Sequence, residues 1–432
     1  MKQPRNDRPR AAGPLPVPGA RPGPVDALFA VVVLALVCFG LVMLLSASMS
    51  EGLSRDDSPL YFFGKQFVFT LIGAAVCFLV SLVNPRLYNR AWIGLLAYVG
   101  TFGILCLVLV PHIGAVSGGA RRWFSLGGIQ VQPSEIAKVL LVFCLAVYYS
   151  RIERLRASGG LERATPFRTF RAALWVEFFL PFFCLLFWLV PIAMEPHMSG
   201  MVILTLVFAA VVCVSGARPR ILLAGLAILV VVALVLGLLL VAMLPSLLPY
   251  LPESLQKYTN LTYIAGRFSV FFHPEQASDD LLWQTKQALQ AIGAGGLTGV
   301  GLGLGRQKFG YLPMSYNDYI FAIIGEELGM LGAILVLALF LVLLFRGAVI
   351  ARKAGGTFGY VLAAGYTTLL VVQALLNIGV ATNSIPPTGI SLPFFSYGGS
   401  SNLMFLAAVG VILAVSRTSR TNATLPGKDG FR

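Results

Sequence analysis

Residues 26–48 read DALFAVVVLALVCFGLVMLLSAS, an apolar run without charge after Asp26 that decides the fold class. About 20 apolar residues in a helix cross a hydrocarbon layer of about 30 Å. Further runs of this kind follow, and all of them are predicted to be helical because lipid offers backbone groups no other hydrogen-bond partner. The ten predicted spans are residues 26–48, 61–83, 91–111, 134–150, 172–194, 199–215, 221–246, 318–345, 357–380 and 397–416.

Composition supports this class and excludes others. Of the 432 residues, 57% are hydrophobic and 12% are charged, whereas soluble domains carry about 25% charged residues. A water-facing surface of ordinary charge cannot be built from this chain. A soluble enzyme, a nucleic-acid-binding protein and a disordered scaffold are therefore excluded, and the sequence predicts an all-α polytopic membrane protein.

The distribution of charge predicts the orientation. The net charge is +14, and most Lys and Arg residues fall in alternate short loops and in the tails, which the positive-inside rule places in the cytoplasm. Both termini are then cytoplasmic. The predicted organisation is a disordered tail at 1–25, a membrane domain at 26–416 and a second tail at 417–432. Its two longest outer segments are 112–133 and the loop 247–317, between the seventh and eighth spans.

Cysteine and histidine point to no disulfide framework and no zinc site. All six cysteines fall inside apolar runs without a CxxC pair, and the three histidines are far apart in the sequence. Small apolar packing residues are the predicted role of the cysteines.

Asp318 is the predicted catalytic candidate on the outer side. It lies in YLPMSYNDYIFAIIGEELG (Tyr311 to Gly329), where a polar loop becomes an apolar helix. Partial desolvation there would raise its proton affinity, which suits a general base. Helix capping by Asn317 or Asp318 is the structural alternative.

Basic residues are predicted on the same side in GGARRWFSLGGIQVQPSEIAK (Gly118 to Lys138). Lys138 follows Ser134 and Glu135 by about one helical turn, so the three can share a face. Glu135 can form a structural ion pair with this lysine. Alternatively, Lys138 and Arg122 bind a lipid-linked phosphate, for which Arg supplies paired donors and Lys a point charge.

Other outer segments hold weaker candidates. Arg267 and Lys308 in the long loop either face phosphate or are solvated, and Glu195 and His197 occupy the short turn EPHMSG. The Gly-rich stretch 293–305 lacks the GK[ST] ending of a phosphate loop and favours close backbone packing.

The last outer segment is irregular in composition. PPTGISLPFFSYGGSS (Pro386 to Ser401) combines prolines, aromatic residues and paired glycines. This composition indicates a cavity lining rich in backbone groups, with Ser396 and Ser400 as candidate substrate contacts.

Four motifs, taken together, give the sequence a resemblance to the SEDS family (shape, elongation, division and sporulation). GARRW…QPSEIAK, WQTKQALQAIGAGGLTGVGLG, YLP…DYIFAIIGEELG and PTGISLPFFSYGGSS follow one another in the order typical of that family, and the resemblance spans about 26–416. It implies a ten-span peptidoglycan glycosyltransferase of the bacterial cytoplasmic membrane that polymerises lipid II at the outer face. The wording of the last motif is nearest the FtsW/SpoVE branch, which favours cell division or sporulation over elongation.

The resemblance also implies residue roles, partners and cofactors. The catalytic aspartate of the family falls on Asp318, and its cavity Arg, Trp and Lys fall on Arg122, Trp123 and Lys138. The outer-loop pattern of the family falls on Arg267, Gln284 and Gln287. A class B penicillin-binding protein transpeptidase and other divisome membrane proteins are the implied partners, and a divalent cation (Mg or Mn) is the one cofactor considered. The acid and His-Thr that relatives carry before the aspartate are replaced here by Met314, Tyr316 and Asn317.

The expected mechanism needs one carboxylate. Asp318 takes a proton from a sugar hydroxyl, and the pyrophosphate leaving group needs no acid. Glu326, eight residues on, would lie about 12 Å away along a helix, beyond the roughly 6.5–9.5 Å of an inverting hydrolase pair. A flippase for the lipid-linked precursor and a non-catalytic divisome scaffold are the alternatives.

Overall fold

The computed structural model describes most of the chain. The described residues are 23–56, 58–117, 120–126, 129–158, 170–195, 197–217, 220–228, 271 and 279–418. Within them the protein is mostly helical. The helices are α1 (Ala27–Asp56), α2 (Tyr61–Leu82), η1 (Pro85–Tyr88), α3 (Ala91–Leu107), α4 (Pro133–Ala157), α6 (Phe170–Leu174), η2 (Trp175–Phe179, a π-helix), α7 (Leu180–Met194), α8 (Met198–Val214), α12 (Asp279–Gly295), α13 (Ile320–Lys353), α14 (Thr357–Ala381) and α15 (Gly399–Arg417).

The helices agree with the predicted spans where the structure describes them. Six candidate membrane spans are long and apolar enough to cross a bilayer, and α3 and α8 are shorter apolar helices of the same kind. The seventh predicted span, 221–246, is helical as far as residue 228, and the rest of it lies outside the described residues. A polytopic membrane protein is thus confirmed.

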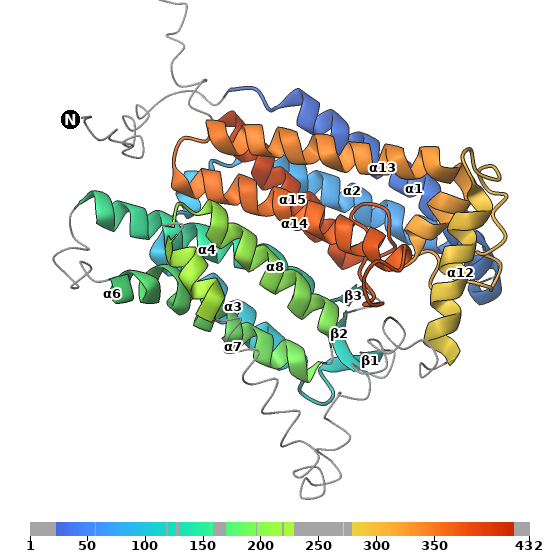
Figure 1. Cartoon of the computed structure of the whole chain (residues 1–432), viewed down its shortest axis with the longest axis horizontal. Helices are drawn as coiled ribbons and strands as arrows, with labels where there is room; N and C mark the ends of the chain where they lie inside the picture. Colours follow the sequence, from blue (N-terminus) through green and yellow to red (C-terminus); the bar gives the residue numbers. More distant parts are fainter. Residues whose placement is uncertain are drawn as a thin grey trace, which may run out of the picture.

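The long helices run side by side along one axis of the molecule, as Figure 1 shows. α14 and α15 are the most enclosed of the candidate spans. In each of them 67% of the most apolar stretch is buried, against 28–39% in the other four. α14 packs against α4, α8, α13 and α15. The centre of the bundle is therefore made by α14 and α15, and lipid is left to the outer helices.

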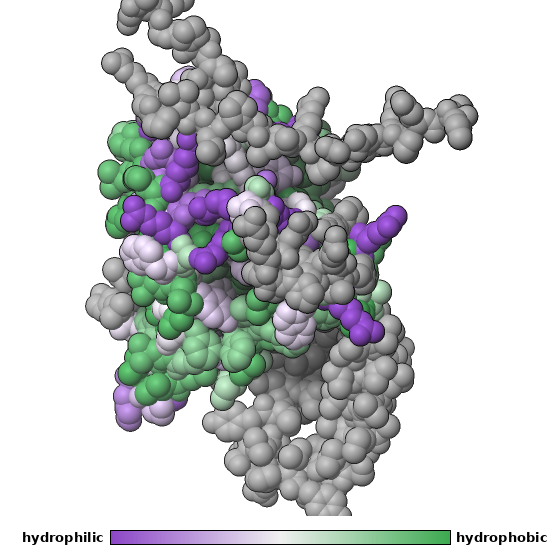
Figure 2. All heavy atoms as spheres, turned by 90° about the vertical axis from the view of Figure 1, so that its left-hand side faces the viewer, coloured by the Kyte–Doolittle hydropathy of each residue, from purple (hydrophilic) through white to green (hydrophobic). Residues whose placement is uncertain are grey.

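The two ends of the bundle differ in character. α12 and the three β-strands lie at one end (Figure 1), hereafter the sheet end. At the opposite end the described part of the chain begins and stops, and the Gly23 amide donates to the Arg417 carbonyl over 3.0 Å. Figure 2 looks onto that end and shows hydrophilic side chains gathered across it. Its exposed basic residues include Arg86, Arg90, Arg151, Arg154, Arg352 and Lys353.

The all-α fold class did not include the β-strands of the segment 112–133, which was predicted as an outer loop. Between α3 and α4 the chain forms an antiparallel sheet in the order β1-β2-β3, made of Gly114–Ser117, Ala120–Leu126 and Ile129–Val131. Two Gly-Gly pairs separate the strands in the sequence, a pattern that predicts hairpins. The sheet places Arg122 and Trp123 beside the start of α4.

The prediction that one helix runs from Asp318 to Glu326 was wrong, because the helix begins after Asp318. Residues 308–319 form turns and α13 begins at Ile320, so a helical rise cannot be counted from Asp318. The Glu326 carboxylate instead accepts from the backbone N–H of Arg306 at 2.8 Å and of Gln307 at 3.2 Å. Glu326 therefore holds the loop before α13.

The Gly-rich stretch 293–305 packs tightly against α13, as its composition predicted. A Cβ on Gly295 would lie 1.8 Å from the Gly325 carbonyl oxygen, and one on Gly299 would lie 2.1 Å from that of Glu327. Gly299 also has φ +81°, where a side chain is strained. Glycine is needed here because backbone meets backbone.

We expect Gly295→Ala to destabilise the protein and Gly293→Ala not to. Both residues lie in α12, but nothing lies within 4 Å of a Cβ built on Gly293. Overpacking at Gly295 should lower the free energy of unfolding by about 1–3 kcal/mol, whereas alanine at Gly293 should raise it by up to about 1 kcal/mol. Thermal unfolding of both variants in detergent measures this, and equal melting temperatures would contradict the packing argument.

Candidate functional site

A polar cavity of about 310 Å³ lies at the sheet end. Its lining comes from β2, the start of α4, the α7–α8 turn, the segment before α13, α14, the α14–α15 segment and α15. The polar lining residues are Arg122, Gln132, Glu135, Lys138, His197, Ser199, Asn317, Asp318, Gln373, Thr388, Ser391, Tyr397 and Ser401, with Trp123 beside them. Segments far apart in the sequence thus converge on one site.

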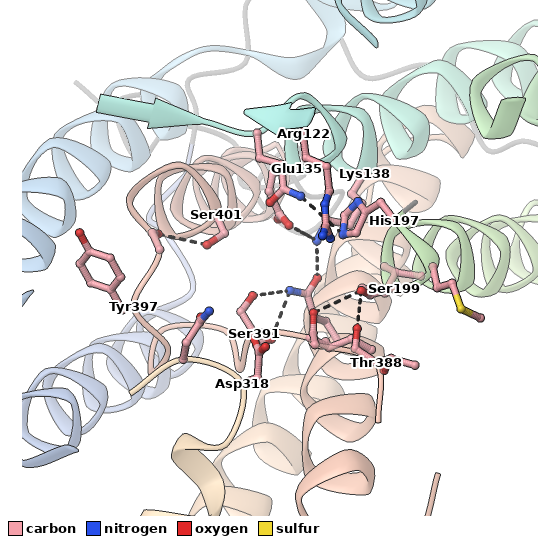
Figure 3. Close-up of a pocket in the computed structure, with 18 of the residues that line it drawn as sticks. Arg122, Glu135, Lys138, His197, Ser199, Asp318, Thr388, Ser391, Tyr397 and Ser401 are labelled. Atoms are coloured by element: carbon pink, nitrogen blue, oxygen red, sulfur yellow. Dashed lines mark hydrogen bonds and ion pairs between the residues drawn. The ribbon is translucent and has the colours of Figure 1, made fainter. Parts of the chain in front are cut away.

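The basic wall is built by β2 and the first turns of α4 (Figure 3). Pro133 starts α4 at a position where its missing N–H does no harm. Lys138 is 2% exposed, and its Nζ lies 2.7 Å from Glu135 Oε1 and Oε2. The ion pair considered from the sequence is present, and both partners also line the cavity.

Asp318 lies on the facing wall, next to the α14–α15 segment (Figure 3). It is half-buried. A Cβ on Gly389, whose φ is +62°, would lie 3.1 Å from Asp318 Oδ2, so glycine leaves room for the carboxylate. The N-cap of α13 is Tyr319, without a side-chain cap hydrogen bond. The N-cap position of α13 is thus taken by neither Asn317 nor Asp318.

Side chains hold the α14–α15 segment in place. Ser199 Oγ donates to the Thr388 carbonyl at 2.6 Å. Ser396 Oγ donates to the Asn317 carbonyl at 2.6 Å and accepts from the Leu392 N–H at 2.7 Å. These contacts place the segment directly against the residue before Asp318.

The short turn between α7 and α8 brings a buried acid close to the basic wall. Glu195 is 1% exposed, and neither carboxylate oxygen has a hydrogen-bond partner among the described residues. Burial raises the pKa of the Glu195 carboxyl from 4.5 to about 8, and the Arg122 guanidinium opposes this rise. His197 lines the cavity itself, with its Nε2 3.5 Å from Gln132 Nε2. Glu195 is therefore neutral near pH 7 and does not cancel the charge of Arg122.

Lys308 does not line the cavity, contrary to the sequence prediction. It is 3% exposed, and its Nζ donates to Glu327 Oε1 at 2.6 Å, to Gly303 O at 2.8 Å and to Ser46 Oγ at 2.9 Å. An ammonium has three N–H donors, and all three are used inside the protein. Lys308 thus joins the loop before α13 to α1 and α13.

Four other predicted contacts also lie away from the cavity lining, and one is not described. Ser396 binds backbone groups as stated above, and Ser400 is buried in the first turn of α15. Gln284 and Gln287 lie on α12. Arg267 lies outside the described residues. Asp318, Arg122, Trp123, Glu135 and Lys138 are the predicted residues that the fold brings together.

The prediction missed several polar residues of the lining. Gln132, Ser199, Gln373, Ser391, Tyr397 and Ser401 line the cavity but were not chosen as substrate contacts. Gln373 had a detectable signal, because an amide within the apolar run 357–380 is rare and marks a functional position. The other residues could be assigned to the lining only from the tertiary structure, because they lie on segments far apart in the sequence.

The arrangement can bind an anion and remove a proton. Arg122 and Lys138 offer positive charge on one wall, and Asp318 offers a carboxylate on the other. A group of three or more His, Cys, Asp or Glu residues able to hold a metal ion is absent from the described residues.

Comparisons with known proteins identify relatives over almost the whole chain. A family model described as cell cycle protein, FTSW_RODA_SPOVE, matches residues 26–421. A probable peptidoglycan glycosyltransferase FtsW of Trichlorobacter lovleyi is 33% identical over 408 residues, covering 94% of this chain and 96% of that one. Stage V sporulation protein E of Bacillus subtilis is 36% identical over 398 residues, covering 91% and 98%.

Solved structures share the fold. A chain from a structure on the coordination of polymerization and crosslinking by a peptidoglycan synthase complex matches with a TM-score of 0.68 and 27% identity, covering 91% of this chain and 98% of that one. The rod shape determining protein RodA of Thermus thermophilus matches with a TM-score of 0.60 and 25% identity, covering 92% and 98%.

We expect Glu195→Gln to remove a pH dependence of stability. Between about pH 4.5 and pH 8 the unfolded state ionises this carboxyl while the folded state keeps it protonated. Stability therefore falls as pH rises, by up to about 1.4 kcal/mol per pH unit from this group. Unfolding is measured in detergent at pH 5.5, 7 and 8. The free energy of unfolding of the variant should increase relative to that of the wild type as pH rises. A difference in stability between variant and wild type that does not change with pH would disprove the raised pKa of Glu195. Glu153→Gln, which changes an exposed acid, is the control.

Lys308→Met should destabilise the protein by about 3–5 kcal/mol, because it leaves Glu327 buried and unpaired. The double variant Lys308→Met/Glu327→Leu should recover most of that loss, since it removes both charges. Denaturant unfolding of the wild type, Lys308→Met, Glu327→Leu and the double variant gives a double-mutant cycle. A double variant as unstable as the single one would argue against the ion pair as the cause.

Proposed function

The chain belongs to the FtsW, RodA and SpoVE family of cell cycle proteins, and we propose that its polar cavity is the active site. The protein is a peptidoglycan glycosyltransferase of the bacterial cytoplasmic membrane, which it crosses several times, and its relatives connect it with cell division. It polymerises lipid II into glycan strands. The observation that supports the proposed site is the meeting of Asp318, Arg122 and Lys138 in one cavity.

Asp318 is the general base of the proposed reaction. The sugar 4-hydroxyl of one substrate attacks the anomeric carbon of the other, and the Asp318 carboxylate accepts the hydroxyl proton. The bond to the pyrophosphate breaks with inversion at that carbon. Pyrophosphate is a weak base, so a second carboxylate acting as an acid is not required. This is consistent with the place of Glu326, which is bound to backbone N–H groups outside the cavity.

The basic wall stabilises the leaving group. Negative charge develops on the pyrophosphate as the bond breaks, and Arg122 and Lys138 are already oriented toward that place by β2 and α4. Preorganised charges of this kind lower the barrier because they need no rearrangement during the reaction. Trp123 and Glu135 complete this wall, the latter by holding the Lys138 ammonium.

A divalent cation fits the proposal as a companion of the pyrophosphate. Mg²⁺ is commonly held by one or two carboxylates together with substrate phosphates. Asp318 is the residue of the cavity that would hold it, and the ion would supply further charge neutralisation.

For the membrane arrangement we propose ten spans with both termini in the cytoplasm. The exposed basic residues at the end opposite the sheet favour the inner side for that end. The cavity then faces outward, on the side of the membrane predicted for the loop 247–317. The proposed domain organisation stays a tail at 1–25, the membrane domain at 26–416 and a tail at 417–432.

A crosslinking enzyme is the proposed partner. One of the similar solved chains comes from a structure on the coordination of polymerization and crosslinking by a peptidoglycan synthase complex. We therefore expect this chain to act with a class B penicillin-binding protein transpeptidase and with other divisome membrane proteins, and not with nucleic acid.

Asp318→Asn should abolish polymerisation while preserving the fold. Without a base, we expect the rate to fall by about 10²–10⁴-fold. Purified protein in lipid with labelled lipid II, followed by separation of glycan products by length, measures this. Glu51→Gln, at an acid of α1 outside the cavity lining, is the control and should polymerise like the wild type.

The same assay separates the alternative functions. Polymer from folded Asp318→Asn at the wild-type rate would refute the base assignment. Wild-type protein that moves labelled lipid II across vesicles without forming polymer would favour the flippase, and protein that does neither would favour the scaffold.

A further inference from the structure

α14 carries two buried amides on its inner face. Gln373 is 1% exposed and Asn377 is 0% exposed. They are four positions apart in the sequence, so they lie one turn apart on the same side of the helix. An amide inside a membrane span is unfavourable unless it is hydrogen-bonded, so the partners of each amide indicate its purpose.

Gln373 connects the basic wall with the α14–α15 segment. Its Oε1 accepts from Lys138 Nζ at 3.0 Å, and its Nε2 donates to Ser391 Oγ at 3.0 Å and Ser391 O at 3.2 Å. An ammonium has three donors. Glu135 and Gln373 take at least two of them, and Lys138 lines the cavity. Gln373 thereby sets the direction of the ammonium without cancelling its charge.

Asn377 makes the corresponding connection to the acid. Its Nδ2 donates to the backbone carbonyl of Asp318 at 2.8 Å and to that of Ile390 at 2.6 Å. Both N–H groups of the Asn377 side chain therefore donate to carbonyl groups that lie outside any helix. The backbone of Asp318 is therefore held by α14 and not only by its own neighbours in the chain.

We propose that Gln373 and Asn377 are positioning residues of the reaction, which set Lys138 and Asp318 at a fixed separation. This inference rests on the proposed function. Gln373 acts through Lys138 on the binding of the pyrophosphate, and Asn377 acts through Asp318 on the proton transfer. The two amides also bind adjacent residues, Ser391 and Ile390, so one stretch of backbone is shared by both connections.

The separate routes predict separate kinetic effects. The pyrophosphate of bound lipid II is already charged before the bond breaks, so most of the attraction of Lys138 is present in both the bound substrate and the transition state. Loss of such uniform binding raises KM with little change in kcat. The position of Asp318 matters for the chemical step, where an error of about 1 Å can reduce the rate about 10²-fold. A merely structural role for both amides would not produce this difference.

Gln373→Met and Asn377→Leu, which keep side-chain volume approximately, provide the test. We expect the KM for lipid II to rise about tenfold in Gln373→Met with kcat within about threefold of wild type. In Asn377→Leu we expect kcat to fall about 10–100-fold with KM nearly unchanged. Gln373→Glu keeps an acceptor for Lys138 but adds a second carboxylate beside it, so its KM should stay raised.

Binding without turnover gives an independent readout. In the Asp318→Asn background, Gln373→Met should weaken the binding of labelled lipid II about tenfold, whereas Asn377→Leu should change it by less than about threefold. Thr368→Val is the matched control, because its hydroxyl donates within α14 to the Ala364 carbonyl. It should keep wild-type kinetics and binding.

Wild-type KM and kcat in both folded variants would overturn the inference and leave the proposed function intact, because that function depends on the wild type and Asp318→Asn alone. An equal fall of kcat in both variants with unchanged lipid II binding would also overturn it. If Asn377→Leu does not fold, Asn377→Ser takes its place. A fall in kcat with unchanged binding supports the inference, and unchanged kcat contradicts it.

Discussion

The cavity depends on the satisfaction of backbone hydrogen bonds in the non-helical segment 386–398. Much of this segment is buried, and a buried backbone group without a hydrogen bond is unfavourable, so the segment keeps this path only where protein groups bind it. Two amides of α14 bind Ile390 and Ser391, and Ser199 of α8 binds Thr388. Gln66 of α2 reaches the segment from the other side and accepts from the Gly398 N–H at 3.1 Å. The shape of the cavity follows from these bonds.

The charges at the sheet end are arranged in two different ways. Lys308 is fully bound by Glu327, Ser46 and Gly303, so its charge stabilises the loop before α13. Lys138 has one carboxylate partner and one neutral amide, and it borders the cavity. A cation of the second kind keeps an attraction for a substrate anion. Both lysines are ion-paired, so what distinguishes them is that Lys308 has two further protein acceptors, whereas Lys138 has one and lines the cavity.

Sequence patterns predicted the helices well and the irregular segments less well. Apolar runs located the spans because each must be long enough to cross lipid, and the four motifs identified the family. The β-sheet at 114–131 was missed, although its Gly-Gly pairs resemble hairpin turns. The helical spacing from Asp318 to Glu326 was wrong because α13 starts only at Ile320. Lys308 was misassigned because its partners lie on α1 and α13.

The sequence by itself determined that the chain is a membrane protein, where most of its helices run and which acid is the candidate base. The first two properties depend on hydrophobicity along the chain, whereas the candidate base rests on its place at a boundary between loop and helix and on the resemblance to the SEDS family. The tertiary structure decided which of the polar residues share a cavity. Gln373, Lys138 and Ser391 are brought together by the packing of α14 against α4 and by the path of the following segment. Such a meeting depends on contacts between distant segments, which no local pattern encodes.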